Sequence, residues 1–265
     1  MSEGPVFELE EVGFSYGEVT ALDGVSWRIS PGCFWGIVGP NGCGKTTLFD
    51  LMARINVPAT GTVSYQGRDI REYSRKELAR EIALVPQDFY INFSFTVREI
   101  VLMGRYPHIS RFAPPAARDL DVVDEIMELL KIDGFNDKYI TELSGGERQR
   151  VVFARALAQD TPVLLLDEGT SNMDIRYTLN LLDMVADKVE TGKMTAIAVF
   201  HNINMAATYC RKLAFMQAGK VVLQGNTDEV LNEQSIKEIF GIDCRVYFDD
   251  YVGARQVAFR RNRKV

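Results

Sequence analysis

A glycine-rich segment near residue 40 carries the clearest chemistry in this sequence. It reads GPNGCGKT, from Gly39 to Thr46, and has the form G-x-x-x-x-G-K-[ST]. Glycines at these positions let successive backbone N–H groups turn inward around an anion, and a helix that begins directly afterwards adds its positive N-terminal dipole. Lys45 supplies a charge for the β- and γ-phosphates of a nucleotide, and the Thr46 hydroxyl is a ligand for Mg²⁺. The predicted phosphate-binding residues are Gly39, Pro40, Asn41, Gly42, Cys43, Gly44, Lys45, Thr46 and Thr47.

Cys43 lies inside this loop, next to the start of the predicted helix. A thiol at a helix N-terminus can have a lowered pKa and hence a raised reactivity. We therefore predict that alkylation of Cys43 blocks ATP binding and that ATP protects the thiol.

Two adjacent carboxylates follow a run of apolar residues in VLLLDE, residues 163–168. An apolar run of this length is typical of a strand buried on both faces of a sheet. Asp167 at its end is placed to hold Mg²⁺, directly or through water. Glu168, one residue further on, can orient or deprotonate an attacking water molecule.

A second candidate anion site lies in LSGGERQR, residues 143–150. Ser144 and Glu147 fit the capping box S-x-x-E, which predicts a helix from about residue 147 to 158. Gly145 and Gly146 lie where this helix begins, and a cap does not explain Gly146, because glycine is a poor helix former. Bare N–H groups at a helix start, with a serine hydroxyl beside them, can bind a phosphate. Nothing nearby in the same chain looks like the ligand of this second site.

Alternating strands and helices must position these residues. Apolar runs at 34–39, 82–87, 163–168 and 195–201 predict buried parallel strands, and helical spacing at 46–55 and about 175–190 predicts helices between them. An α/β sheet of this kind binds ligands at the carboxyl ends of its strands. Alternation at 5–35 and turns at 61–70 predict antiparallel strands, and residues 212–225 predict two strands around Ala218 and Gly219.

The expected organisation is a single domain, 1–265, with an inserted helical part. Residues 1–88 and 158–225 form the nucleotide-binding core with its antiparallel β subdomain, and 89–157 form a helical subdomain. Residues 226–265 are expected to be an extension with one short helix, SIKEIFG, and otherwise irregular chain.

Composition excludes several classes of function. The net charge of −6 argues against a nucleic-acid partner, and four cysteines with two histidines show no zinc-ligand spacing. The N-terminus has no apolar signal core, and no run approaches the ~20 apolar residues that span a bilayer. A soluble protein with reduced thiols is therefore expected, and such a subunit can still dock on a membrane protein.

The motifs together resemble the nucleotide-binding subunit of an ABC transporter, in which LSGGE is the family signature. The resemblance extends to about residue 245 and implies a P-loop NTPase (RecA-like) fold with ATP and Mg²⁺ as ligands. It also implies a head-to-tail dimer of two copies, in which each signature closes over the ATP held by the other copy. The ligand of Ser144 and Gly146 would then lie on the partner chain.

The resemblance assigns roles to four further residues. Tyr16, in FSYG, matches the aromatic residue that stacks on adenine, and Gln87, in VPQD, matches the glutamine that senses Mg²⁺ and the attacking water. Asp174, in SNMD, matches a loop that contacts the other subunit. His201, which ends AVFH, matches the switch histidine at the γ-phosphate. Lys45, Gln87, Glu168 and His201 thus form the expected catalytic set.

Three positions depart from the family pattern. Gly169 replaces the usual proline after the catalytic glutamate, Met173 replaces a leucine, and Asn202 replaces an aspartate. Glycine in place of proline loosens the turn that carries Glu168. The departures put the rate in doubt, but the chemical groups are all present.

The segment VLMGRYPH, residues 101–108, is similar to one in ATPases that serve importers of iron–siderophore complexes, haem and vitamin B12. This resemblance implies a subunit at the cytoplasmic face of the membrane, paired with two copies of a permease and, indirectly, an extracytoplasmic substrate-binding protein. The segment would line the groove that receives a permease helix. His108 has no second metal ligand nearby, so a metal site there is not expected.

Other functions remain open from the sequence. An exporter subunit, or an importer of another substrate such as a metal ion or molybdate, would carry the same nucleotide motifs. A non-transport ABC ATPase is a second alternative, although the ribosome-acting type carries two cassettes in one chain. An ATP-sensing regulator without catalysis is the third, and Glu168 and His201 argue against it.

Overall fold

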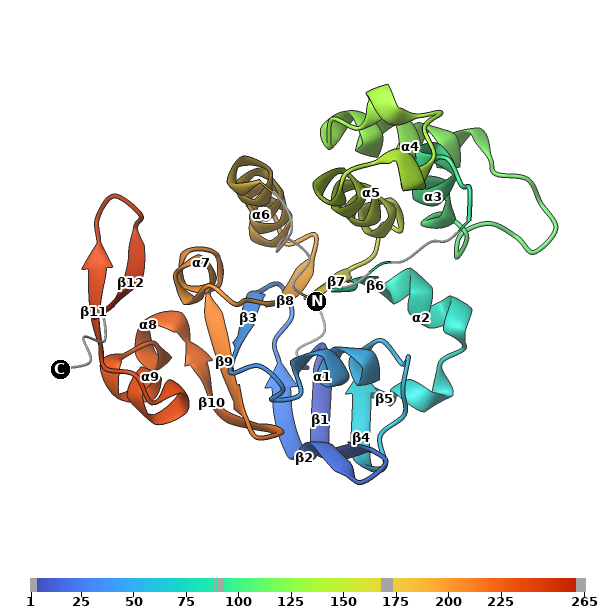
Figure 1. Cartoon of the computed structure of the whole chain (residues 1–265). Coiled ribbons are helices and arrows are strands. Elements are labelled where there is room, and N and C mark those ends of the chain that lie inside the picture. Colours follow the sequence, from blue (N-terminus) through green and yellow to red (C-terminus); the bar gives the residue numbers. More distant parts are fainter. Residues whose placement is uncertain (1–3, 88, 90–92, 168–173, 261–265) are drawn as a thin grey trace. The chain divides into compact units, whose positions relative to one another are not determined.

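The computed structural model describes residues 4–87, 89, 93–167 and 174–260. The chain divides into two compact units (Figure 1). Unit 1 comprises Met1–Glu72 and Ala186–Val265, and unit 2 comprises Tyr73–Val185. These limits differ from the division at residues 88, 157 and 225 proposed above, which stays a prediction.

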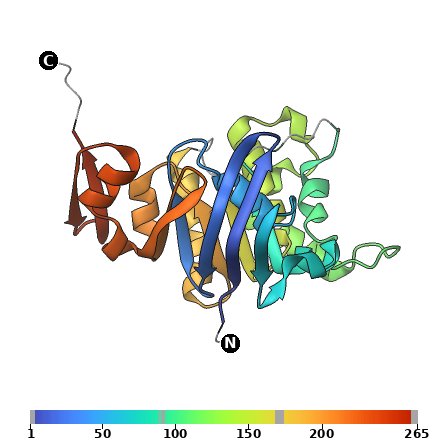
Figure 2. The same cartoon turned by 90° about the horizontal axis from the view of Figure 1, so that it is seen from below.

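An antiparallel sheet forms the N-terminal part of unit 1 (Figure 2). The order of its strands is β2-β1-β4-β5. Their bounds are Phe7–Tyr16 for β1, Val19–Ile29 for β2, Thr60–Tyr65 for β4 and Arg68–Asp69 for β5. Buried and exposed residues alternate along much of β2, as expected for strands with one face in the core. The predicted antiparallel strands at 5–35 and the hairpin at 61–70 are confirmed.

Parallel strands form the second layer of unit 1. The strand β3 (Phe34–Val38) pairs in parallel with β8 (Thr195–Val199) on one side and β9 (Lys212–Gln217) on the other. Every residue of β3 and β8 is buried, which explains their continuous apolar sequences. The strand β10 (Lys220–Asn226) adds an antiparallel edge to β9, so the predicted pair around residue 218 is confirmed.

Helices connect these strands at the edge where they end. Helix α1 (Lys45–Met52) follows β3 through the phosphate loop, Gly39–Thr46. Helix α7 (Ile203–Tyr209) follows β8 through His201 and Asn202. Two functional segments therefore leave neighbouring parallel strands at their carboxyl ends, as the α/β pattern predicted.

The C-terminal part of unit 1 is more ordered than the sequence suggested. Helices α8 (Thr227–Val230) and α9 (Glu233–Phe240) are followed by an antiparallel hairpin of β11 (Cys244–Asp249) and β12 (Ala254–Phe259). The expectation of irregular chain after the short helix was wrong. The strands carry aromatic and β-branched residues, but much of the hairpin remains exposed, so the period-2 pattern is weak. Figures 1 and 2 show the hairpin at the end of unit 1, beside α7 and α9.

Unit 2 is mainly helical, with one short pair of parallel strands. The strands β6 (Ile82–Val85) and β7 (Val163–Asp167) pair in parallel. The helices of unit 2 are α2 (Arg75–Glu81), α3 (Val97–Met103), α4 (Ala117–Leu129), α5 (Gly145–Ala158) and the first part of α6 (Ile175–Glu190). Short 3₁₀ helices lie at Asp133–Phe135 and Ile140–Glu142, and another, Ile70–Glu72, ends the first segment of unit 1.

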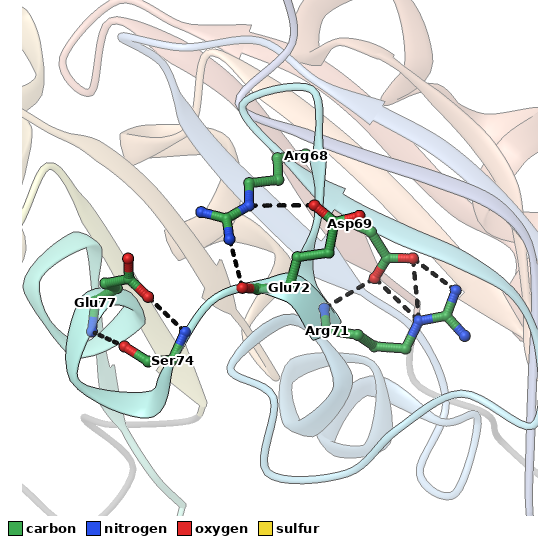
Figure 3. Close-up of polar contacts among 6 residues, drawn as sticks. All are labelled: Arg68, Asp69, Arg71, Glu72, Ser74 and Glu77. Carbon is green, nitrogen blue, oxygen red and sulfur yellow. Dashed lines mark hydrogen bonds and ion pairs between the residues drawn. The ribbon is translucent and has the colours of Figure 1, made fainter.

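Local polar contacts hold the chain segments on either side of the boundary at Tyr73 (Figure 3). In unit 1 the Arg71 guanidinium binds the Asp69 carboxylate at 2.6 Å. In unit 2 the Ser74 N–H donates to Glu77 Oε2 at 2.6 Å, and the Glu77 N–H donates to Ser74 Oγ at 3.1 Å. This capping box fixes the start of α2.

Candidate functional site

The phosphate loop of unit 1 is built from glycines that no other residue could replace without strain. Gly42 and Gly44 have φ values of 75° and 100°, in the region that favours glycine. A Cβ atom on Gly39 would lie 2.2 Å from the carbonyl oxygen of Met216, so the loop needs a bare backbone there. Gly44 is the N-cap of α1 and brings no side-chain cap, so the first N–H groups of α1 stay available to a ligand.

Lys45 places a buried positive charge over this loop. Its side chain is only 6% exposed, and its ammonium donates to the carbonyl oxygens of Gly39 and Pro40, each at 3.0 Å. A buried cation beside the open start of a helix favours a polyanion. Thr46, the next residue, is exposed at the first turn of α1, where its hydroxyl can reach a ligand.

Cys43 does not have the acidic thiol that its position suggested. The residue is 4% exposed, and burial raises the pKa of its thiol despite the opposing charge of Lys45. The prediction of a lowered pKa was therefore wrong, because desolvation outweighs the helix N-terminus here. Whether a modified Cys43 blocks ATP stays a prediction, and the neutral thiol should react slowly.

Tyr16 presents an exposed ring at the end of β1, in the same unit. The residue is 52% exposed, and its ring packs edge-on against Phe14 with centroids 5.0 Å apart. The side chain of Asn56 donates to the Tyr16 hydroxyl and to Asp50 Oδ2, each at 3.4 Å, and so links the tyrosine to α1. Sequence reasoning missed Asn56, because an asparagine after a helix gives no periodic signal.

The switch segment of unit 1 runs from Phe200 to Asn202. The Phe200 N–H donates to the carbonyl oxygen of Ile37 in β3 at 3.0 Å, which continues the parallel pairing to the edge of the phosphate loop. His201 and Gly39 both line a pocket of about 580 Å³. Asn202 caps α7 by accepting from the N–H groups of Asn204 and Met205. Asparagine and aspartate cap equally well, so this departure from the family pattern keeps the local fold.

Gln87 and Asp167 lie at the carboxyl ends of the paired strands of unit 2. Asp167 ends β7 and is 3% exposed, whereas Gln87 is exposed two residues after β6. Val85 pairs with Leu166, so both residues lie near the same edge of the strand pair. Asp174 accepts from the Arg176 N–H at 2.9 Å and thus caps α6. Glu168, Gly169 and Met173 lie outside the described residues.

The signature tip, Ser144–Glu147, begins α5 and shows the predicted capping box. The Ser144 N–H donates to Glu147 Oε2 at 2.8 Å, and the Glu147 N–H donates to Ser144 Oγ at 3.4 Å. Hydrogen bonds from the Ser144 hydroxyl and N–H lower the pKa of Glu147. Ser144 and Gly145 are exposed, and beyond the neighbouring residues and the backbone of its own helix no described atom lies within 4 Å of a Cβ built on Gly145. The fold of this chain therefore does not itself require glycine at Gly145. The helix begins at Gly145, two residues before the predicted start.

The segment at 101–108 is largely internal to unit 2. Arg105 is buried, and its guanidinium binds Asp119 at 3.0 Å and the carbonyl oxygen of Ala158 at 2.8 Å. The His108 ring nitrogen Nε2 lies 2.7 Å from the carbonyl oxygen of Gln159, so this histidine has a structural contact. Tyr106 differs, because 57% of it is exposed.

The described part of the chain contains no group of three or more His, Cys, Asp or Glu residues that could hold a metal ion. Across the same residues, no helix combines the length and the apolar character that crossing a bilayer requires.

The family of the chain follows from a comparison with known proteins. A model of the ABC transporter family matches residues 22–171, which include the phosphate loop, the signature tip and Asp167. The chain belongs to this family. The resemblance inferred from the motifs is thereby confirmed, and with it ATP as the class of nucleotide that the family binds.

Curated members of the ABC family match along most of the chain. The cobalamin import ATP-binding protein BtuD of Halobacterium salinarum is 41% identical over 88% of this chain, and the match spans 58% of that protein. The ferric enterobactin transport ATP-binding protein FepC of Escherichia coli is 36% identical, over 92% of this chain and 90% of that protein.

Solved structures of ABC proteins share the fold. An inward-facing transporter assigned to the metal-chelate type has a TM-score of 0.82 at 27% identity and covers 98% of this chain and 99% of its own. The ATP-binding cassette MJ0796, a dimer with ADP and phosphate, has a TM-score of 0.75 at 26% identity, over 83% of this chain and 98% of its own. The predicted P-loop NTPase (RecA-like) fold, with parallel strands, an antiparallel subdomain and a helical insert, is confirmed.

Proposed function

We propose that the chain is the ATP-hydrolysing subunit of an ABC importer for a metal chelate, of the iron–siderophore, haem or cobalamin class. The class is supported by the named functions of the relatives BtuD and FepC and by the metal-chelate type of the structural neighbour. It is also supported by the similarity of residues 101–108 to a segment of such ATPases. The subunit would act at the cytoplasmic face of the membrane, on two permease copies and, through them, on a substrate-binding protein.

One observation supports the proposal most strongly: each unit carries one candidate anion site, and the two sites offer different groups. The phosphate loop in unit 1 brings a buried cation, Lys45, and an open helix start. The signature tip in unit 2 brings an exposed serine and a glycine whose Cβ position is open. A single triphosphate needs one of each, and a two-fold dimer supplies them from different chains.

The dimer would be head-to-tail, with two ATP molecules at its interface. The Ser144 hydroxyl and the N–H groups of α5 would contact the γ-phosphate that the partner's phosphate loop holds. The ring of Tyr16 would stack on adenine, and Asp174 would lie at the contact between the copies. A dimeric neighbour that holds ADP and phosphate supports this arrangement.

The oxygen ligands that Mg²⁺ prefers are present. The exposed Thr46 lies in the first turn of α1, Asp167 is the last residue of β7, and Gln87 follows the neighbouring strand β6. When bound, the ion would neutralise charge on the β- and γ-phosphates.

Hydrolysis would use residues of this chain that hold water and the terminal phosphate. Glu168 would orient or deprotonate the attacking water, and His201, beside Gly39 in one pocket, would contact the γ-phosphate. Loss of that phosphate would release the contact between Lys45 of one copy and Ser144 of the other, and the dimer would open. Binding and release would thereby drive the permease.

The decisive test is the substitution Glu168→Gln in the full-length chain. ATP affinity should be preserved, phosphate release should fall by orders of magnitude, and an ATP-bound dimer should accumulate, because binding needs no base but hydrolysis does. Light scattering measures the dimer, and a phosphate-release assay measures turnover. The matched control is Glu190→Gln, at an exposed position near the end of α6, which should leave both unchanged.

Normal turnover in the Glu168→Gln variant would refute the assigned base. A strictly monomeric variant with ATP, both alone and with its permease, would refute the shared site. Absence of phosphate release from the unsubstituted chain, alone and with the permease, would instead favour the ATP-sensing regulator.

A further inference from the structure

The C-terminal hairpin is attached to the helix that follows the switch histidine. The Val257 N–H in β12 donates to Asn204 Oδ1 at 2.7 Å, and Asn204 Nδ2 donates to the Val257 carbonyl oxygen at 3.2 Å. A carboxamide that pairs with both the N–H and the C=O of one residue imitates a neighbouring strand, so it fixes position and orientation together. Val257 is 4% exposed and Asn204 is half-buried, so these bonds are partly shielded from water.

The other edge of the hairpin is attached as well. The Val246 N–H in β11 donates to Glu233 Oε1, at the first turn of α9, at 3.2 Å. A two-stranded hairpin is marginally stable by itself in water. The bonds to α7 and α9 therefore hold β11 and β12 in a defined place, and the hairpin in turn supports α7 along the side of Asn204.

Helix α7 needs such support, because it is only seven residues long. Isolated helices of this length are unstable in water, and tertiary contacts must hold them. Its residues Ile203, Ala206 and Ala207 are buried, while Asn204 faces the hairpin. His201 precedes the cap of this helix by one residue, so the direction of α7 sets where the histidine side chain can reach.

A shared pocket shows that the hairpin approaches the nucleotide machinery. The pocket of about 580 Å³ is lined by Gly39 from the phosphate loop, by His201 and Asn204, and by Phe259 at the end of β12. Ile236 and Phe240 of α9 belong to its apolar wall. Segments that are far apart in the sequence thus meet next to His201.

We infer that Asn204 and the C-terminal hairpin form a positioning device for His201, with Asn204 as the positioning residue. This inference rests on the proposed role of His201 at the γ-phosphate. The hairpin would hold α7, and with it the switch segment, in the orientation that hydrolysis requires. Residues 244–260, for which the sequence suggested no role, would therefore contribute to turnover without touching ATP.

The first test replaces, in the full-length chain, each of the two residues that share this pair of hydrogen bonds. Asn204→Ala removes both bonds, and Val257→Pro removes the donor while keeping an apolar side chain. Removing an orienting partner typically lowers activity about ten- to a hundredfold, and we expect kcat to fall about tenfold in each variant. KM and Kd for ATP should change little, because the phosphate loop and Tyr16 are untouched. The double variant should lose no more than either single one.

The matched control is Arg255→Ala, on the same strand. Arg255 faces Asp228 of α8 at 3.7 Å rather than α7, so this variant should keep the kcat of the unsubstituted chain. Thermal unfolding of every variant identifies any that fails to fold. Asn204→Asp, which retains the acceptor but not the donor, should give an intermediate kcat.

The second test reads the histidine directly. The chain has two histidines, so an imidazole ¹H–¹⁵N spectrum contains only His108 and His201. In Asn204→Ala and Val257→Pro the His201 signals should shift, while those of His108, which contacts Gln159 in unit 2, should stay in place as an internal reference.

The outcomes separate the inference from the function on which it rests. If His201→Ala keeps full turnover, the proposed role of His201 fails, and the spectra alone then decide whether Asn204 positions the ring. If His201→Ala is inactive but Asn204→Ala and Val257→Pro keep the kcat of the unsubstituted chain, the positioning device is overturned. A lower kcat with unmoved His201 signals overturns it as well.

Discussion

Unit 2 contains two short motifs with glycines, GRYPH at residues 104–108 and the signature tip. The structure surrounds the glycines of these two motifs differently. At Gly104 a Cβ would lie 2.2 Å from the carbonyl oxygen of Arg155 and 3.2 Å from the Ala158 Cβ. At Gly145 a Cβ would meet no described atom within 4 Å. The first glycine is required by the packing of this chain, and the second is not.

The difference indicates why a glycine stands at each of these two positions. Arg105 and His108 bind groups of the same unit, so most of GRYPH serves to join α3, α4 and the end of α5. Nothing comparable constrains Gly145, and its capping partners Ser144 and Glu147 would hold α5 equally well with alanine between them. The described part of the chain gives no packing reason for this glycine, which agrees with the shared ATP site of the proposed dimer.

The largest effect is expected where GRYPH is most deeply internal, at the Arg105–Asp119 pair. Asp119→Ala leaves a buried guanidinium without its carboxylate, and such a change costs about 3–5 kcal/mol of unfolding free energy. Denaturant titration measures this loss. Asp121→Ala, at an exposed position of the same helix, removes the same charge and should cost little.

The stability from this pair also depends on pH. Burial raises the pKa of Asp119, but the hydrogen bond and charge of Arg105, with the Ala116 N–H, outweigh it, so the pKa lies below its usual value. A depressed pKa gives stability that is complete above the unfolded value of about 3.9 and disappears as pH falls through the folded value. The difference between the unsubstituted chain and Asp119→Ala should therefore shrink only in acid. A constant difference down to the lowest pH would contradict the ion pair.

Gly104→Ala should destabilise the fold, because its methyl group meets backbone that cannot move freely. Overpacking of this kind costs about 1–3 kcal/mol. Turnover per folded molecule should remain close to normal. Gly134→Ala serves as the control, since a Cβ on Gly134, unlike one on Gly104, would meet nothing within 4 Å. An unchanged melting temperature for Gly104→Ala would show that the motif is not held by packing.

Gly145→Ala should have the opposite effects on stability and on turnover. Alanine is the better helix former, so the variant should be more stable than the unsubstituted chain by about 0.5 kcal/mol. Its turnover should nevertheless fall, by roughly tenfold, because the methyl group would intrude on the phosphate held by the partner copy. Thermal unfolding and phosphate release measure the two effects. Full turnover in this variant would remove the argument that the glycine serves a second chain.

Much of the fold follows from patterns that the sequence shows directly. The continuous apolar runs of β3, β7 and β8 and the helical spacing of α5 depend on local periodicity, and they appear where expected. The hairpin of β11 and β12 does not, because it is exposed on much of its surface and is held by hydrogen bonds to the side chains of Asn204 and Glu233. Such contacts depend on the tertiary fold and leave no period in the sequence.

The residues of the candidate site also fall into those that the sequence pattern predicts and those that it does not. The phosphate loop is recognisable because anion binding dictates glycines, a lysine and a threonine at fixed spacing, and the structure supports the need for Gly39 and Gly44. The pKa of Cys43 was misjudged, because the sequence shows proximity to a helix start but not burial. Asn56 and Asn204 were missed, because a bridging amide is defined by the partners that the fold brings to it.

The smallest effect on the chain itself is expected at Tyr106, the one exposed aromatic of GRYPH. Its neighbours are fixed inside unit 2 by Arg105 and by the Arg80 guanidinium, which donates to the Pro107 carbonyl oxygen at 2.8 Å. The chain that carries this exposed ring is thus held in place, as suits an anchor for the proposed permease helix. Tyr106→Ala should change the unfolding free energy by less than about 0.5 kcal/mol and leave the ATPase of the chain alone unchanged. Affinity for the permease should fall, whereas Phe112→Ala, which removes an aromatic 92% exposed in the same insert, should keep it. Equal permease binding by the two variants would mean that GRYPH, unlike the signature tip, serves no contact with another chain.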